Sequence, residues 1–461
     1  MRPLVGVRAA GTAALLLADT SRTVMGLVYL PLLAWGPLLV SPSLRRTAPR
    51  ESNPLTSTVM GIVTVVGIGA DGWAGLDAAT QSIVLDADVV VGGERHLTML
   101  PPKGGQIRKQ WPSPLRKQLA AFLDSLDGTI VALASGDPLV SGVGTTLINT
   151  IGADNVEIIP AISSVALAGA RMKWAAESVE VISLVGRDPH NVLRGLAPRH
   201  RILALSADGS TPGKVAQLLV DAGYGASAMT VLSDLGNPEE RRHESTAATW
   251  TEDAPALNII AIECAGGAPL LGWTGGLPDE AFEHDGQLTK RDIRASALAR
   301  LAPQPGQLLW DVGAGAASVA IEWMRAHPTC HATAIEARED RAKRGADNAA
   351  RLGVPALHVV NGHAPEALEG IEAPHAIFIG GGATEPGVLE ACWSALQTGG
   401  RLVVHGVTLE TESVLARWYG EHGGELTRLH VEHAAPIGSF TGWKPARAIT
   451  QWSATKGMVG K

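Results

Sequence analysis

The stretch that decides the fold of the carboxyl-terminal half is LWDVGAGAASVAIEWM, residues Leu309–Met324. An apolar run ends at Asp311, glycines follow at Gly313 and Gly315, and a helical pattern begins near Ala317. Because glycine has no Cβ, the backbone here can approach a ligand closely, and the first turn of the helix offers unpaired N–H groups. The stretch therefore predicts a strand, a ligand-binding turn and a helix.

An acidic residue at the end of the next predicted strand indicates the kind of ligand. Glu336 follows Asp311 by 25 residues, and a carboxylate there can accept hydrogen bonds from both hydroxyls of a ribose. This fits NAD or S-adenosylmethionine. Ser318 occupies the position where the dinucleotide pattern requires a third Gly or Ala, so we favour S-adenosylmethionine. We expect backbone around Gly362 and Ala364 to hold its adenine.

Short β-branched runs alternate with helical patterns from Ile62 onward, in two series with different spacing. This pattern predicts α/β folds whose sheets are largely covered on both faces. The expected strands of the first series are 62–69, 87–93, 129–138, 155–161, 179–186, 201–208, 228–236 and 257–264. Those of the second are 307–315, 330–337, 356–365, 375–382 and 400–408. Five parallel strands in the second series predict a doubly wound sheet with its ligand at their carboxyl ends.

A chain of 461 residues is too long for one ordinary domain. The Gly- and Pro-rich run Ala265–Pro278 marks a linker. We predict this division: a non-core extension over 1–59, a first domain over 60–265, a linker over 266–278 and a second domain over 279–461.

The extension contains an uncharged segment, Thr23–Leu44, that is long enough to span a membrane but is interrupted by prolines. We interpret 1–59 as a mis-assigned or dispensable segment, with Met60 as a natural start. A membrane anchor and a targeting peptide are the alternatives. We predict no membrane partner.

Charge and composition narrow the partners and cofactors. The formal net charge is −7, and neither predicted domain has the basic excess of a nucleic-acid binder. The three cysteines, Cys264, Cys330 and Cys392, form no CxxC pair, which indicates reduced thiols and a cytoplasmic protein. The 14 histidines show no ligand spacing such as HExxH, so we predict no metal site.

The amino-terminal half has its own glycine-rich motifs. These are VTVVGIGADGWAGL (Val63–Leu76), LASGDPLVSGVG (Leu133–Gly144) and PAISSVALAGARM (Pro160–Met172). Together they resemble the two-lobed methyltransferases of tetrapyrrole pathways. The resemblance implies a folded S-adenosylmethionine in a cleft between two α/β lobes. The residues it places at the cofactor are Gly67, Gly69, Ser135, Gly136, Asp137, Pro138, Ser163 and Ser164.

In the carboxyl-terminal half, four further motifs accompany the glycine turn. These are DEAFEHDGQLTKRDIRA (Asp279–Ala295), APEAL (Ala364–Leu368), GGRLVVHGVTLETE (Gly399–Glu412) and TGWKPARAITQW (Thr441–Trp452). They resemble the class I (Rossmann-like) S-adenosylmethionine-dependent enzymes that methylate and decarboxylate precorrins.

With both halves in one chain, the sequence resembles the fused precorrin-6Y C5,15-methyltransferase (decarboxylating) family of cobalamin biosynthesis. The resemblance implies that the first half methylates C5 of precorrin-6B (precorrin-6Y). The second would methylate C15 and decarboxylate the C12 acetate, giving precorrin-8X. It implies one S-adenosylmethionine site per domain and a homo-oligomer.

The residues that would serve a precorrin follow from its chemistry. Its carboxylates should need Arg and Lys. The candidates are Lys290, Arg291, Arg294, Lys444 and Arg447 in the second half, and Arg171 and Arg187 in the first. Helical spacing places Lys290 and Arg294 on one face, although a solvated basic helix end would look the same.

Decarboxylation would be helped by a nearby acid. Glu283, His284 and Asp285 lie in a segment that could cover the site, and a plain surface loop is the alternative. Two other functions compete with the resemblance: an RNA or protein substrate for the second half, and a non-catalytic S-adenosylmethionine sensor.

Overall fold

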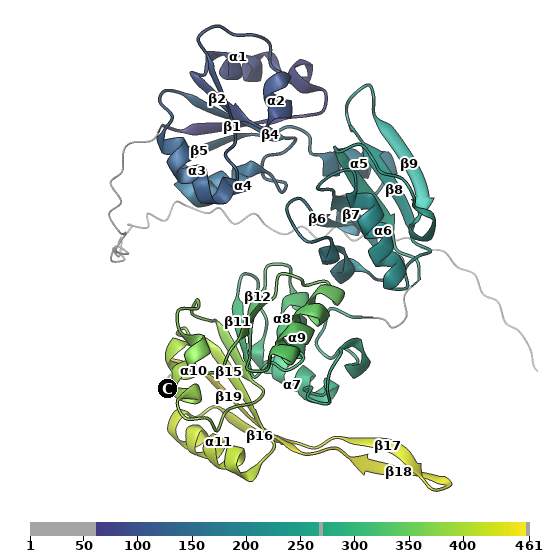
Figure 1. Cartoon of the computed structure of the whole chain (residues 1–461), viewed down its shortest axis with the longest axis vertical. Helices are drawn as coiled ribbons and strands as arrows, with labels where there is room; N and C mark the ends of the chain where they lie inside the picture. The colour runs from purple at the N-terminus through teal and green to yellow at the C-terminus, as the bar shows by residue number, and fades with distance from the viewer. Residues whose placement is uncertain (1–60, 267–270, 458–461) are drawn as a thin grey trace, which may run out of the picture. The chain divides into compact units, whose positions relative to one another are not determined.

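The computed structural model describes residues 61–266 and 271–457 (Figure 1). The predicted extension and the start at Met60 fall outside the described residues, as do 267–270 of the predicted linker. Within the described ranges, no helix combines the length and apolarity needed to cross a bilayer.

The first lobe of the amino-terminal half is a parallel five-stranded sheet in the order β3-β2-β4-β1-β5. Its strands are β1 (Val63–Ile68), β2 (Val89–Gly92), β3 (Ile107–Gln110), β4 (Ile130–Ser135) and β5 (Val156–Ile159). Its helices are α1 (Ala78–Asp86), α2 (Glu94–Thr98), α3 (Leu115–Asp124) and α4 (Val143–Ile151). Four of these strands match the prediction, and β3 is an addition.

The second lobe is a mixed sheet in the order β6-β7-β10-β8-β9. Its strands are β6 (Glu180–Ser183), β7 (Arg201–Leu205), β8 (Ala228–Ser233), β9 (Arg241–Thr246) and β10 (Asn258–Glu263). Its helices are α5 (Ser164–Met172) and α6 (Thr211–Asp221). Strand β10 pairs antiparallel with β7 and β8, and β9 pairs antiparallel with β8. The sequence did not predict β9, because its residues are polar and mostly exposed.

The carboxyl-terminal half contains a seven-stranded sheet in the order β13-β12-β11-β14-β15-β19-β16. Its strands are β11 (Leu308–Val312), β12 (His331–Glu336), β13 (His358–Asn361), β14 (Ala376–Ile379), β15 (Arg401–Gly406), β16 (Glu425–Leu429) and β19 (Ile449–Thr455). Its helices are α7 (Arg291–Leu301), α8 (Ser318–Ala326), α9 (Glu339–Arg351), α10 (Val388–Ala395) and α11 (Leu409–His422). The five predicted parallel strands are confirmed, and β19 lies between β15 and the edge strand β16, antiparallel to both.

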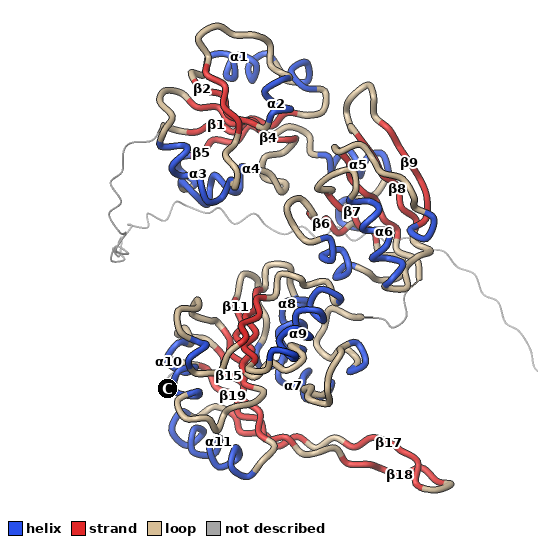
Figure 2. The backbone as a smooth tube through the Cα atoms, in the orientation of Figure 1, coloured by secondary structure: helices blue, strands red, loops and turns tan. Residues whose placement is uncertain are grey.

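A separate two-stranded hairpin, β17 (Glu432–Ile437) and β18 (Phe440–Pro445), extends away from this sheet (Figure 2). Three large apolar side chains on it are exposed, those of Ile437, Phe440 and Trp443.

Both faces of the seven-stranded sheet are covered, as the unpatterned apolar strands predict. Along β11, Leu309 packs into one buried apolar cluster, while its neighbours Leu308 and Trp310 pack into another. Successive side chains of a strand point to opposite faces, so the two clusters lie on opposite sides of the sheet. Neighbouring strands β11 and β14 lie where the strand order reverses, and ligands of doubly wound sheets bind at such a point.

Candidate active sites

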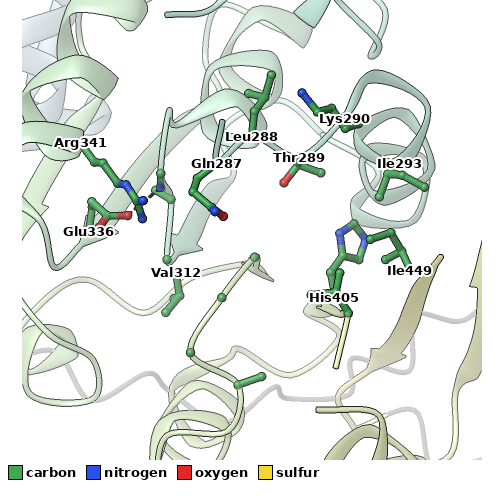
Figure 3. A pocket seen from close by; sticks show the side chains of 18 of the residues that line it. Gln287, Leu288, Thr289, Lys290, Ile293, Val312, Glu336, Arg341, His405 and Ile449 are labelled. Atoms are coloured by element: carbon green, nitrogen blue, oxygen red, sulfur yellow. Dashed lines mark hydrogen bonds between the residues drawn. The ribbon is translucent and has the colours of Figure 1, made fainter. Parts of the chain in front are cut away.

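A cavity of about 980 Å³ lies at the carboxyl ends of β11, β12, β13 and β14 (Figure 3). Five of the six predicted cofactor residues of this half line it: Gly313, Gly315, Glu336, Gly362 and Ala364. The structure thus brings together, in one cavity, residues from three strand ends that are far apart in the sequence.

The glycine turn has no room for a side chain at Gly313 and little at Gly315. Gly313 has φ +68°, and a Cβ there would lie 2.7 Å from the carbonyl oxygen of Gly381. Gly315 has φ +56°, and its N–H donates to the Glu336 carboxylate at 2.8 Å. Both positions have the left-handed backbone that glycine adopts without strain, so the turn holds backbone N–H groups and Glu336 at the cavity wall.

Glu336 is held from two sides but keeps free acceptor capacity. One carboxylate oxygen accepts from Gly315 N–H, and the other accepts from Arg338 N–H at 3.0 Å. A carboxylate has about four acceptor positions, so it can still accept from a diol. Figure 3 shows the Arg341 side chain extending toward it. The residues present fit an S-adenosylmethionine with its ribose at Glu336.

Asp311, the sixth predicted cofactor residue, does not line the cavity. It is buried, and its Oδ2 accepts from Ala320 N–H at 3.0 Å, near the start of α8. Its Oδ1 has no hydrogen-bond partner among the described residues. Burial raises the pKa of this carboxyl to about 7, and Glu336 adds to the rise. We therefore correct its role: Asp311 anchors helix α8 beneath the turn.

The predicted basic residues divide into two groups. Lys290, Arg291 and Arg447 line the cavity, whereas Arg294 and Lys444 do not. Lys444 lies on the hairpin strand β18. Lys290 lies 3.5 Å from Asp279 and is more than half exposed, so it remains accessible to an anionic ligand.

Arg294 is not available to a substrate, although it lies on the same side as Lys290: both side chains contact the Asp279 carboxylate, at 3.4 Å from Arg294 and 3.5 Å from Lys290. Helix α7 begins at Arg291, which leaves Lys290 extended before it. The Arg294 side chain is fully buried and its Nε donates to Glu322 at 2.5 Å. Its other nitrogens donate to Asp279 and to the carbonyls of Thr289 and Leu277. Arg294 therefore ties the segment before α7 to α8.

The predicted acids lie outside the cavity lining. Asp285 accepts from Arg341 Nε at 2.8 Å, and this hydrogen bond lowers the pKa of Asp285 to about 2. A carboxyl that is ionised at neutral pH has no proton to donate. Glu283 lies 3.6 Å from Arg351 and is largely exposed, and His284 Nδ1 accepts from Gly286 N–H at 3.0 Å. The alternative interpretation as a surface loop fits these contacts.

A buried histidine at the cavity was missed from the sequence. His405 lies at the end of β15 with Nε2 2.9 Å from Gln451 Oε1, and its ring packs edge-on against Phe378 at 4.8 Å. Burial lowers the pKa of His405 to about 4, so the ring is neutral at physiological pH. Figure 3 shows it beside Ile449. The signal was a single polar residue inside the apolar run LVVHGV.

The amino-terminal half has a cavity of about 390 Å³ at the ends of β1, β2 and β4. Six of its eight predicted cofactor residues line it, namely Gly69, Ser135, Gly136, Asp137, Ser163 and Ser164. Ser163 Oγ also accepts from Ala166 N–H at 3.1 Å and caps helix α5.

Gly67 and Pro138 do not line this cavity but shape the loops that do. A Cβ on Gly67 would lie 2.0 Å from Gly136 O and 2.6 Å from Ala161 N. The Pro138 carbonyl would lie 2.5 Å from a Cβ on Gly142. Such close backbone approaches require glycine, so these residues set the loop geometry.

The two arginines predicted to bind substrate in this half lie elsewhere. Arg171 makes two hydrogen bonds with Glu240, at 2.5 and 2.9 Å. Arg187 is exposed and is not among the described residues that line the cavity. Two residues that the sequence analysis did not single out, Arg95 and His96, line it instead.

These two sites belong to two methyltransferase domains of different kinds. Residues 63–250 match the family model of the tetrapyrrole (corrin/porphyrin) methylases. Residues 280–456 match that of the precorrin methyltransferase domain.

The curated relatives identify the family. The chain is 44% identical over 409 residues to a precorrin-6Y C(5,15)-methyltransferase [decarboxylating] of Sinorhizobium sp, covering 88% of this chain and 99% of the relative. It is 45% identical over 400 residues to the protein of that name from Mycobacterium tuberculosis, covering 86% of this chain and all of the relative. A cobalt-precorrin-7 C(5)-methyltransferase of Salmonella typhimurium is 33% identical over 203 residues, 44% of this chain and 99% of the relative. The chain belongs to the precorrin-6Y C5,15-methyltransferase (decarboxylating) family.

Proposed function

We propose that this chain is a bifunctional S-adenosylmethionine-dependent methyltransferase of cobalamin biosynthesis. It methylates C5 and C15 of precorrin-6B (precorrin-6Y) and decarboxylates the C12 acetate, giving precorrin-8X. The observation that carries the proposal is the presence of two separate cavities, each built on glycine-rich strand ends, in one chain that belongs to this family.

Each half holds one S-adenosylmethionine. When bound, this cofactor supplies an already activated methyl group, so the chain must mainly hold and orient the reacting partners and exclude water. In the carboxyl-terminal half, Glu336 binds the ribose, and backbone at Gly313 and Gly315 lies against the cofactor. In the amino-terminal half, the backbone of the loops at Gly69 and Gly136 lies against the cofactor.

The two halves divide the work. Residues 60–265 methylate C5, and residues 279–461 methylate C15 and remove CO₂. A stand-alone relative named a C(5)-methyltransferase aligns over 99% of its length with 44% of this chain, which supports a division of the reactions between separate parts of the chain.

The cationic lining of the larger cavity suits a polycarboxylate. Lys290, Arg291 and Arg447 can each donate to a carboxylate side chain. Loss of CO₂ from the acetate leaves an electron pair that the conjugated ring can accept, and a proton from water then completes the methyl group. His405 stays neutral beside Gln451 and adds no positive charge at physiological pH.

We further propose that the protein is cytoplasmic and homo-oligomeric, without a nucleic-acid or membrane partner. The three cysteines are buried free thiols, which suits a reducing compartment. Exposed Phe440 and Trp443 on the β17–β18 hairpin favour contact with another protein surface.

Counting cofactor sites tests the two-site proposal independently of the order of the reactions. Titration calorimetry with S-adenosylhomocysteine should find two sites in the wild type and one in Gly313→Val or Gly136→Val. In both variants the added side chain enters space next to backbone oxygen atoms. One site in the wild type, or two in both variants, would contradict the proposal.

A further inference from the structure

Arg95 is the only lysine or arginine among the described residues that line the amino-terminal cavity. It lies in helix α2, which directly follows β2. No carboxylate lies within 4.0 Å of its guanidinium in the part of the chain that the structure describes. Arg171 and Arg194 in the same half are both paired with glutamates. Arg95 is thus a half-buried cation without a salt-bridge partner among the described residues, and the Asp234 carboxylate acts on it only from beyond 4.0 Å.

A neutral histidine fixes the position of this cation. His96 Nε2 lies 2.8 Å from Arg95 Nη2 and 3.0 Å from Ser135 Oγ. Because a guanidinium nitrogen can only donate, His96 Nε2 must accept and the proton must sit on Nδ1. Burial, with the nearby Arg95 charge, lowers the pKa of His96 to about 4. His96 therefore holds Arg95 and does not share its charge.

The contacts leave part of the guanidinium free. Arg95 Nη2 also donates to Ser135 Oγ at 3.0 Å, so both of its hydrogens have acceptors. Nη1 meets only the weak acceptor Sδ of Met99, at 4.0 Å. Of five guanidinium hydrogens, those on Nε and Nη1 lack a strong acceptor among the described residues. A half-buried charge with free donors is stabilised by an anion.

We propose that Arg95 binds a carboxylate side chain of the tetrapyrrole in the amino-terminal cavity, with His96 and Ser135 as positioning residues. This inference rests on the proposed function. Both ligands of the site carry carboxylates, one in S-adenosylmethionine and several in a precorrin. The precorrin is the stronger candidate, because its many negative charges need a cation and the cavity lining offers this one.

The test compares Arg95→Gln with the wild type in the full-length protein, with Arg116→Gln as the matched control. Arg116 is exposed on α3 and outside the cavity lining. We expect the KM for the tetrapyrrole in C5 methylation to rise roughly 10- to 100-fold in Arg95→Gln, because the variant loses a hydrogen bond between a charged donor and a carboxylate. The affinity for S-adenosylhomocysteine should change less than twofold. CO₂ release by the other half is the internal control for folding.

Further variants separate charge from geometry. Arg95→Lys should recover part of the affinity, because it keeps the charge but not the planar fork. His96→Phe should raise KM with a smaller effect on kcat, since it only loosens Arg95. An equal loss of S-adenosylhomocysteine affinity in Arg95→Gln would overturn the inference by assigning Arg95 to the cofactor, and an unchanged KM would overturn it outright.

The inference and the proposed function can fail separately. Binding of the precorrin to protein saturated with S-adenosylhomocysteine needs no turnover. If the wild type binds the precorrin without methylating it, the proposed function fails, and the difference in affinity between wild type and Arg95→Gln still decides the role of Arg95.

Discussion

Replacing Arg294 with Met tests whether this arginine is structural or binds substrate. Its side chain is fully buried, and the Glu322 side chain beside it is 2% exposed. Glu322 also accepts from the backbone N–H groups of Gly276, at 2.5 Å, and Leu277, at 2.9 Å. Arg294→Met leaves this carboxylate buried without its cation. Breaking a buried ion pair on one side costs about 3–5 kcal/mol, and we expect a loss of that size in the carboxyl-terminal half.

A double-mutant cycle measures the coupling free energy between Arg294 and Glu322, apart from the other contacts that each residue makes. Glu322→Leu alone leaves Arg294 with only the 3.4 Å contact to Asp279 as a carboxylate partner and should also destabilise this half. The double variant should be less destabilised than the sum of the two, because no buried charge remains and apolar residues replace the pair.

The assay is guanidinium unfolding of the full-length protein, with hydrogen exchange of peptides from α7 and α8 to assign the transition to this half. The KM for the tetrapyrrole is measured on the same samples. Unchanged unfolding in Arg294→Met together with a tenfold higher KM would refute the structural role and restore the substrate-binding interpretation.

Three other changes probe the carboxyl-terminal site. Gly313→Ala should weaken S-adenosylhomocysteine binding at least tenfold, because the added Cβ would lie 2.7 Å from a carbonyl oxygen. The measurement is titration calorimetry. Gly399→Ala is the control, because Gly399 has a similar φ but no atom lies within 4 Å of an added Cβ there. The folded-state pKa of Asp311 is about 7 against an ordinary 3.8, so the folded state holds its proton more tightly. The free energy of unfolding of the wild type, measured relative to that of Asp311→Asn, should therefore fall by about 4 kcal/mol as pH rises from 4 to 7 and stay level above pH 7. Denaturant unfolding at several pH values measures this difference, and a difference that does not change with pH would contradict the prediction. Asp285→Asn should release CO₂ within about twofold of the wild-type rate at neutral pH, since the low pKa of Asp285 leaves it no proton to give; a tenfold loss would show that it acts in the reaction.

The sequence predicted the parts of the sites that depend on local backbone chemistry. The glycine turn at Gly313 and Gly315 and the acid at Glu336 are encoded within one strand–turn–helix unit and the next strand, and all three line the cavity. The central strands followed from their apolar runs. Edge strands such as β9 did not, because polar residues exposed to solvent carry no burial pattern.

The remaining site residues depend on contacts between distant segments. Helical spacing could not show that α7 begins after Lys290, or that Arg294 forms a buried ion pair with Glu322 on α8. The importance of Arg95 appears only when the ends of β2 and β4 meet and bring it to Ser135. The role of a charged residue depends on which residues of other segments it contacts, and the sequence alone does not show those contacts.

Mass spectrometry of the full-length protein, incubated with S-adenosylmethionine and precorrin-6B, shows directly whether one chain carries out both methylations and the decarboxylation. We predict a product that has gained two methyl groups and lost one CO₂, with both changes made by one chain. A bound cofactor without any change in the mass of the tetrapyrrole would contradict it, because the two sites would then serve another substrate or no reaction at all.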